Sequence, residues 1–177
     1  RGITFIEDAA QGTGSTYKGP PAGSFGWASV FSFNSTTPLS CFEGGALVTY
    51  DEYLYKACKI LRYHGQNVYN PNSPTYWAEQ IGFKYTPSNI SAAMALAQLE
   101  RIDELVLKKR RINHIYNSVL GGMPVQINGD TDSVFTGAWV TCVIYEGMHK
   151  DDMMKQLADR GIPSRPMLYP LTQHPAF

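Results

Sequence analysis

The amino-acid sequence predicts an α/β fold with a mostly parallel sheet. Short apolar runs with the length of buried strands occupy residues 1–8, 28–33, 46–50 and 139–145. Helical patterns occupy residues 54–61, 88–120 and 150–160. Alternation of strands and helices is typical of α/β proteins, which bind ligands at the carboxyl ends of their strands. We therefore expect a ligand site near Asp8 and after Phe33.

The first helical segment has clear boundaries in the sequence. Its apolar residues follow the i, i+3, i+4, i+7 spacing of an amphipathic helix: Leu54, Ala57, Cys58 and Leu61. Asp51 is placed to accept a hydrogen bond at the start of the helix, and Gly65 is a stop signal. Residues 66–76 are rich in Asn and Pro, which predicts a loop.

The second helical segment is long and changes character along its length. Residues 92–97 are apolar on all sides and are expected to be buried, whereas the part from Glu100 onward has a narrower apolar stripe. Gly121 and Gly122 end the pattern. Such a helix often bridges two domains, and we expect the second, smaller domain to begin within it.

Composition and charge exclude several classes of protein. Of 177 residues, 44% are hydrophobic, and 15 basic residues balance 15 acidic ones. The chain therefore lacks the excess of positive charge that is typical of nucleic-acid-binding proteins. No apolar stretch approaches the roughly 20 residues of a membrane span, and no signal peptide is visible. The three cysteines match neither a disulfide framework nor a metal site. We expect a reduced, cytoplasmic protein with no nucleic-acid or membrane partner.

A series of motifs runs along almost the whole chain in a fixed order. They are EDAAQ at 7–11, GSFG at 23–26, FSF at 31–33, EGGA at 43–46, LR at 61–62, HG at 64–65, IGFKY at 81–85, SNI at 88–90 and YP at 169–170. With these motifs the chain resembles the DegT/DnrJ/EryC1/StrS family of pyridoxal-phosphate (PLP) aminotransferases, which act on nucleotide-linked keto sugars. Within that family it is most similar to the perosamine-synthase-like branch.

The resemblance implies a fold, a division into domains and a set of partners. It implies part of a three-layer large domain of the type I PLP-dependent transferases over residues 1–108, followed by the start of a smaller α+β domain over 109–177. Family members are longer, so we expect this chain to be a fragment that lacks the N-terminal part. The implied partners are a nucleotide sugar, an amino donor such as glutamate, and a second subunit in a homodimer with shared active sites.

The resemblance also implies which residues contact the cofactor. PLP acts as an electron sink while its pyridine nitrogen stays protonated, a state that a nearby carboxylate enforces. Asp8 matches the family residue with that role, and Gln11 matches the one that bonds the phenolic oxygen. Ala10 would lie beneath the ring, Ser32 would donate to the phosphate, and Lys84 would reach the site of the neighbouring subunit. No metal is implied.

The chain departs from the family at the residue that carries the chemistry. The family places a Schiff-base lysine five residues after the serine, and Thr37 stands there. A threonine hydroxyl cannot form an imine and is a poor proton acceptor at neutral pH. Phe42 replaces a usual glycine, and Thr172 stands where the family has a histidine, with His174 two residues on.

Several hypotheses follow from this departure. The first is an aminotransferase whose activity is in doubt. The second is a dehydratase-like PLP enzyme without the lysine, in which His64 or His174 would have to act as base. The third is a catalytically degenerate subunit that pairs with an active homologue. In each case that keeps PLP, binding is expected to be non-covalent. A serine hydrolase and a Rossmann NAD site are rejected, because neither Gly-x-Ser-x-Gly nor Gly-x-Gly-x-x-Gly occurs.

Overall fold

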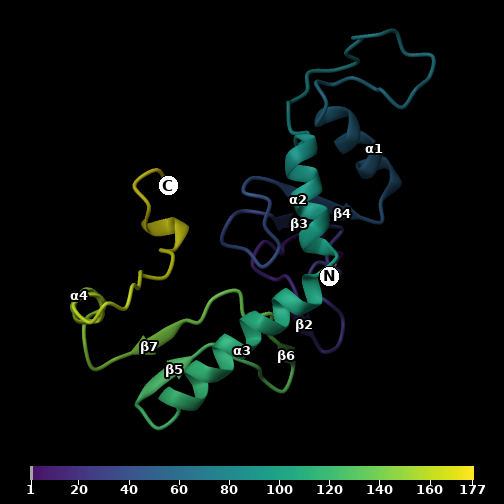
Figure 1. Ribbon diagram of the computed structural model, residues 1–177. Coiled ribbons are helices and arrows are strands. Elements are labelled where there is room, and N and C mark those ends of the chain that lie inside the picture. The colour runs from purple at the N-terminus through teal and green to yellow at the C-terminus, as the bar shows by residue number, and fades with distance from the viewer. Residues whose placement is uncertain (1) are drawn as a thin grey trace.

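The computed structural model describes residues 2–177 and contains a small mixed sheet near the N-terminus (Figure 1). Its strands are β1 (Ile6–Asp8), β3 (Ala28–Ser32) and β4 (Gly45–Thr49), in the order β1-β3-β4. β1 and β3 are parallel, whereas β3 and β4 are antiparallel, so the expectation of a mostly parallel sheet is wrong here. The chain returns from β3 to β4 through a loop instead of a crossover helix, and this reverses the strand direction.

Two further strand pairs complete the sheets of the described residues. β2 (Thr16–Tyr17) pairs with β6 (Val134–Phe135), and β5 (Val125–Ile127) pairs with β7 (Val143–Tyr145), both antiparallel. The strand expected over residues 139–145 is therefore present only in its last part. The β2–β6 pair joins two segments far apart in sequence and brings the second half of the chain to the first.

Helix α1 (Glu52–Leu61) begins and ends close to where the sequence predicts, and it packs against β4. Asp51 Oδ1 accepts a hydrogen bond from the Leu54 N–H at 2.8 Å, so the predicted N-cap is confirmed. Residues 66–76 form the predicted loop.

The long helix predicted over residues 88–120 is two helices, α2 (Asn89–Leu99) and α3 (Ile102–Leu120), which meet at a bend in Figure 1. Arg101 has φ −118° and ψ 16°, which is not helical. The apolar part at residues 92–97 was expected to be buried, but all of it except the half-buried Ala95 is exposed; Leu96, for example, is 57% exposed. No described element covers α2, so burial does not follow from an apolar composition alone.

The remaining elements are short. They are α4 (Lys150–Ala158), close to the predicted helix over 150–160, and a 3₁₀ turn at Leu171–Gln173. α3 runs without interruption through residues 108 and 109, and the division into two domains at this point remains a prediction. No helix among residues 2–177 is both long and apolar enough to cross a membrane.

The buried core lies around the ends of β1 and β3. Its apolar members are Ala9, Ala28, Leu39, Cys41, Val106 and Ala138. β1 itself is mostly exposed, contrary to the expectation of a buried strand, because in the described residues it pairs only with β3. The core therefore consists mainly of loop residues, together with Ala28 of β3 and Val106 of α3, and it supports the loops that follow those strands.

Candidate active site

The predicted ligand site lies where two parallel strands end next to each other. Asp8, the last residue of β1, is in register with Val30 of β3, and Ser32 ends β3 two residues later. The Ala9 N–H donates to Val30 O at 2.9 Å and continues the pairing past the strand. Asp8 and Ser32 are thus at the carboxyl edge of the same sheet, next to the positions near Asp8 and after Phe33 where the strand pattern predicts a ligand site.

Asp8 begins a tight turn that leaves much of its carboxylate accessible. Its Oδ1 accepts a hydrogen bond from the Ala10 N–H at 3.1 Å, and the side chain is exposed. Ala10 is half-buried and Gln11 is exposed on the same turn. One carboxylate oxygen and the Gln11 amide are therefore available to a ligand at the sheet edge.

Ser32 lies at the start of the loop between β3 and β4. Its Oγ accepts a hydrogen bond from the Asn34 N–H at 3.3 Å, and its residue partner across the sheet is Gly45. The hydroxyl hydrogen of Ser32 has no acceptor among residues 2–177, so it can be donated to an anionic group.

Thr37 is turned into the loop that carries it. The residue is only 9% exposed, and its Oγ1 lies 2.8 Å from Asn34 O and 2.6 Å from Leu39 O. The Thr37 N–H also donates to Asn34 O, at 3.0 Å. Because its single hydroxyl proton is used inside the loop, Thr37 stabilises the loop conformation and offers no base to a ligand.

The two ends of this loop are joined by backbone hydrogen bonds. The Phe33 N–H donates to Gly44 O, and the Cys41 N–H donates to Phe33 O, both at 2.9 Å. Phe42 has φ +69° and is 66% exposed. The position where the family usually has glycine is thus in the left-handed region that favours glycine.

One contact of this loop is not visible in the sequence. The Trp139 indole N–H donates to Thr36 O at 2.9 Å, across 103 positions of sequence. Trp139 falls within a segment with strand-like composition, and nothing in that composition indicates a partner in the loop. The contact depends on the turn before Trp139, where Ala138 is buried with φ +52°.

Lys84 lies apart from these residues within the chain. It pairs through its backbone with Tyr63, and its Nζ lies 5.7 Å from the centre of the Tyr63 ring. His64, beside it, donates its N–H to Phe83 O at 2.9 Å. No hydrogen bond among residues 2–177 connects Lys84, His64 or His174 to Asp8 or to the loop of Thr37. A role for Lys84 in the site of a neighbouring subunit remains a prediction.

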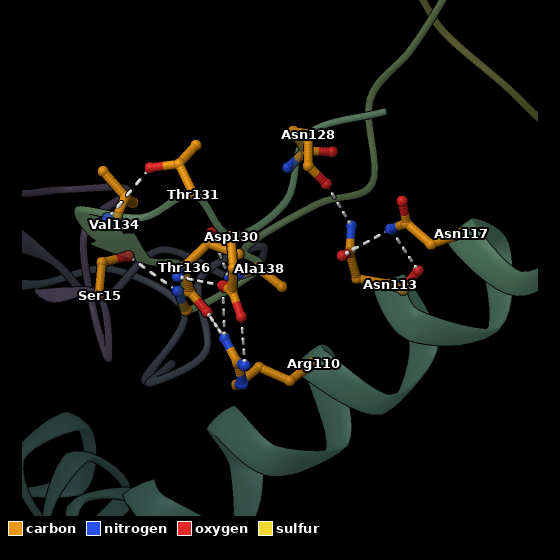
Figure 2. A network of polar contacts seen from close by, with 11 residues as sticks. Ser15, Arg110, Asn113, Asn117, Asn128, Asp130, Thr131, Val134, Thr136 and Ala138 are labelled. Atoms are coloured by element: carbon orange, nitrogen blue, oxygen red, sulfur yellow. Dashed lines mark hydrogen bonds and ion pairs between the residues drawn. The ribbon is translucent and has the colours of Figure 1, made fainter. Parts of the chain in front are cut away.

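A second polar cluster connects α3 to the loop before β6 (Figure 2). Arg110 donates to Asp130 and to Thr136 O, while Asn113, only 6% exposed, donates to Asn128 O at 3.0 Å. The hydrogen bond from Arg110, followed by that from the Thr136 N–H, lowers the pKa of Asp130 below its ordinary value. The cluster uses its polar groups internally, which identifies it as structural.

Comparison with known proteins places these observations in a family. A family model described as the DegT/DnrJ/EryC1/StrS aminotransferase family matches residues 1–177. GDP-perosamine synthase from Vibrio cholerae is 34% identical over 99% of this chain and 48% of its own length. The enzyme of the same name from Escherichia coli O157:H7 is 35% identical over 100% of this chain and 48% of its own length.

The fold agrees with these relatives. A structure from Streptococcus pneumoniae, described as a sugar aminotransferase in its PLP form, has a TM-score of 0.89 at 29% identity. The match covers 98% of this chain and 46% of that one. The fold predicted from the motifs is thereby confirmed, and the chain spans about half the length of the curated relatives it matches.

Proposed function

Since the chain belongs to the DegT/DnrJ/EryC1/StrS aminotransferase family, we propose that its protein binds PLP and acts in amino-group transfer to a nucleotide-linked keto sugar. Two relatives are named GDP-perosamine synthase, which makes a GDP-linked keto sugar the first acceptor to assay. Glutamate is the first amino donor to assay. The proposal concerns the protein that carries this chain, since the relatives are about twice as long.

The observation that carries the proposal is the position of Asp8 and Ser32 at neighbouring strand ends. When bound, PLP supplies an electron sink for negative charge on the substrate carbon. The Asp8 carboxylate would hold the proton on the ring nitrogen, and the Ser32 hydroxyl would donate to the phosphate. Gln11 would bond the phenolic oxygen, and Ala10 would leave room beneath the ring.

These residues fit a cofactor held without a covalent bond. Asp8 has an unused carboxylate oxygen, Gln11 is exposed, and Ser32 has a hydroxyl hydrogen to donate. The loop, by contrast, has no lysine between Asn34 and Ser40. The Thr37 hydroxyl, bonded to Asn34 O and Leu39 O, neither anchors the cofactor nor accepts a proton from the substrate, so amino-group transfer requires a base from elsewhere, for which His64 and His174 are the candidates.

The test uses the full-length protein and compares it with a Thr37→Lys variant. PLP is added, the visible absorption spectrum is recorded, borohydride is added, and the intact mass is measured. We expect the unaltered protein to give a PLP spectrum without a mass increase, and Thr37→Lys to gain the mass of one reduced cofactor. Thr36→Lys is the matched control, because its side chain starts one residue away and should form no specific adduct.

Two results would contradict parts of this proposal. If neither the unaltered protein nor Thr37→Lys gives a PLP signal, the cofactor assignment fails. If the unaltered protein gains a covalent adduct at another lysine, non-covalent binding is wrong and a different residue replaces the family lysine. Amino transfer from glutamate to a GDP-linked keto sugar, followed by mass spectrometry of the sugar nucleotide, tests the activity itself.

A second function is favoured by the burial of Thr37. Because this side chain is built into the loop, the protein could serve as a subunit that keeps the fold and pairs with a lysine-bearing homologue. Co-expression of the two proteins, with different affinity tags, tests this alternative. It predicts that tandem purification yields a mixed dimer with activity above that of either protein alone.

A further inference from the structure

Among residues 2–177, a single side-chain hydrogen bond reaches the loop that contains Thr37 from outside, in addition to the packing of Leu39 and Cys41 in the core. The Asn34 side chain accepts hydrogen bonds from the Thr36 N–H at 3.2 Å and from the Thr36 hydroxyl at 3.3 Å. On its other side, Thr36 O accepts the Trp139 indole N–H at 2.9 Å. The Thr37 N–H also donates to Asn34 O at 3.0 Å, so the peptide between Thr36 and Thr37 is bonded to Asn34 within the loop and to Trp139 from a distant segment.

Trp139 is in turn fixed by the turn that precedes it. The Gly137 N–H donates to Ser15 Oγ at 2.8 Å, and the Ala138 N–H donates to Thr136 Oγ1 at 3.1 Å. Ala138 is only 3% exposed and has φ +52°, a conformation that costs a non-glycine residue energy and that the surroundings must hold. Figure 2 shows Ser15, Thr136 and Ala138 meeting at this turn beside Arg110.

The Arg110 cluster anchors the same turn on its other side. Arg110 donates to Thr136 O and to Asp130, and the Asp130 carboxylate accepts the Thr136 N–H at 2.8 Å. Both backbone polar groups of Thr136 are thus bonded to residues that α3 and its neighbouring loop supply. A continuous set of contacts leads from α3 through residues 136–138 to Trp139 and then to Thr36.

From this set of contacts we infer that Trp139 is a positioning residue for the candidate cofactor site: its indole N–H fixes the loop of residues 34–41 beside Ser32. The effect of Trp139 on cofactor binding rests on the proposed function. Its effect on the loop rests on the geometry of the hydrogen bond to Thr36 alone. It assigns a role in the site to a residue 102 positions after Thr37. It also gives the Arg110 cluster an indirect effect on that site.

The test uses the full-length protein with Trp139→Phe, which keeps an aromatic ring and removes the N–H donor. Trp27→Phe is the matched control, because the Trp27 indole N–H also makes one side-chain hydrogen bond, to Asp51 Oδ2 at 3.0 Å, away from the loop. Hydrogen exchange of the peptide covering residues 34–41 is measured without added cofactor. PLP affinity is then measured from the visible absorption of the bound cofactor.

We expect faster exchange in residues 34–41 for Trp139→Phe and unchanged exchange there for Trp27→Phe. We also expect PLP affinity to fall about fivefold for Trp139→Phe, as for the loss of one neutral hydrogen bond, and to stay the same for Trp27→Phe. A general loss of stability in either variant would instead accelerate exchange throughout the protein. Faster exchange that is confined to residues 34–41 therefore distinguishes positioning of the loop from a merely structural role.

Two outcomes would overturn the inference. Unchanged exchange in residues 34–41 of Trp139→Phe would show that the indole does not hold the loop. Faster exchange with unaltered PLP affinity would show that the loop is held but does not shape the cofactor site. If the unaltered protein binds no PLP, the proposed function fails instead, and the exchange data alone decide whether Trp139 positions the loop.

Discussion

Arg110 and Asp130 form a bidentate ion pair that joins helix α3 to the loop before β6. Arg110 Nη1 lies 3.1 Å from Asp130 Oδ1, and Nη2 lies 2.8 Å from Oδ2. The Arg110 side chain is only 22% exposed, whereas both members of the Lys56–Glu52 pair on α1 are more than 60% exposed. The Arg110–Asp130 pair is therefore less screened by water and holds a more defined geometry.

The first prediction concerns the pH dependence of this pair. Asp130 has its pKa lowered from the ordinary value of 3.8 by Arg110, so its charged form stabilises the folded state. This contribution is fully present above pH 3.8, the unfolded value, and is lost as the pH falls through the lower folded value. Asp130→Asn should therefore lower the free energy of unfolding by roughly 1 kcal/mol at neutral pH.

Urea unfolding of Asp130→Asn and the unaltered protein at pH 7 and at acid pH checks this prediction. The difference between them should shrink as the pH falls below the ordinary aspartate pKa. Asp132→Asn is the control, because this exposed carboxylate lies on the same loop and forms no ion pair among the described residues. An Asp130→Asn effect that persists undiminished in acid would show that charge is not its cause.

A second prediction follows from the backbone of Phe42. At φ +69° a side chain with a Cβ atom is strained, and glycine is not. Phe42→Gly should therefore be more stable than Phe42→Ala by about 1 kcal/mol, measured by urea unfolding. Phe25 is the control, because it is 41% exposed and its φ is not positive. There the glycine variant should be less stable than the alanine variant, because glycine brings only an entropic cost. Equal stabilities of the two Phe42 variants would contradict the strain argument.

Local signals in the sequence were sufficient for the start of α1 and for the sheet edge. Asp51 caps α1 as predicted, since an N-cap depends only on residues within one turn of it. The break at Arg101 was missed because the residues on either side of it continue an apolar pattern. The exposure of residues 92–97 was also missed, because burial depends on what packs against a helix and not on its own composition.

The candidate site was predictable in part, for a similar physical reason. Motif order identified the family, and the strand pattern predicted a ligand site near Asp8 and after Phe33; Ser32 was indicated only by the family resemblance. The bond from Trp139 to Thr36 and the burial of Thr37 could not be predicted, because both depend on how distant loops meet. The family resemblance implies that Thr37 stands at the position of the Schiff-base lysine, and the structure shows that its hydroxyl bonds to Asn34 O and Leu39 O within the loop.

The last prediction concerns the space at Gly137, the residue that ties the turn before Trp139 to Ser15. A Cβ atom at this position would overlap the backbone carbonyl oxygen of Thr13, so alanine forces one of the two backbones to move. Gly137→Ala should lower the free energy of unfolding by about 1–3 kcal/mol, the usual cost of overpacking. Gly129→Ala is the control, because nothing lies within 4 Å of a Cβ atom there and its φ is not positive. If the two variants unfold at the same urea concentration, the turn is looser than its contacts indicate, and the path from α3 to Thr36 loses its middle step.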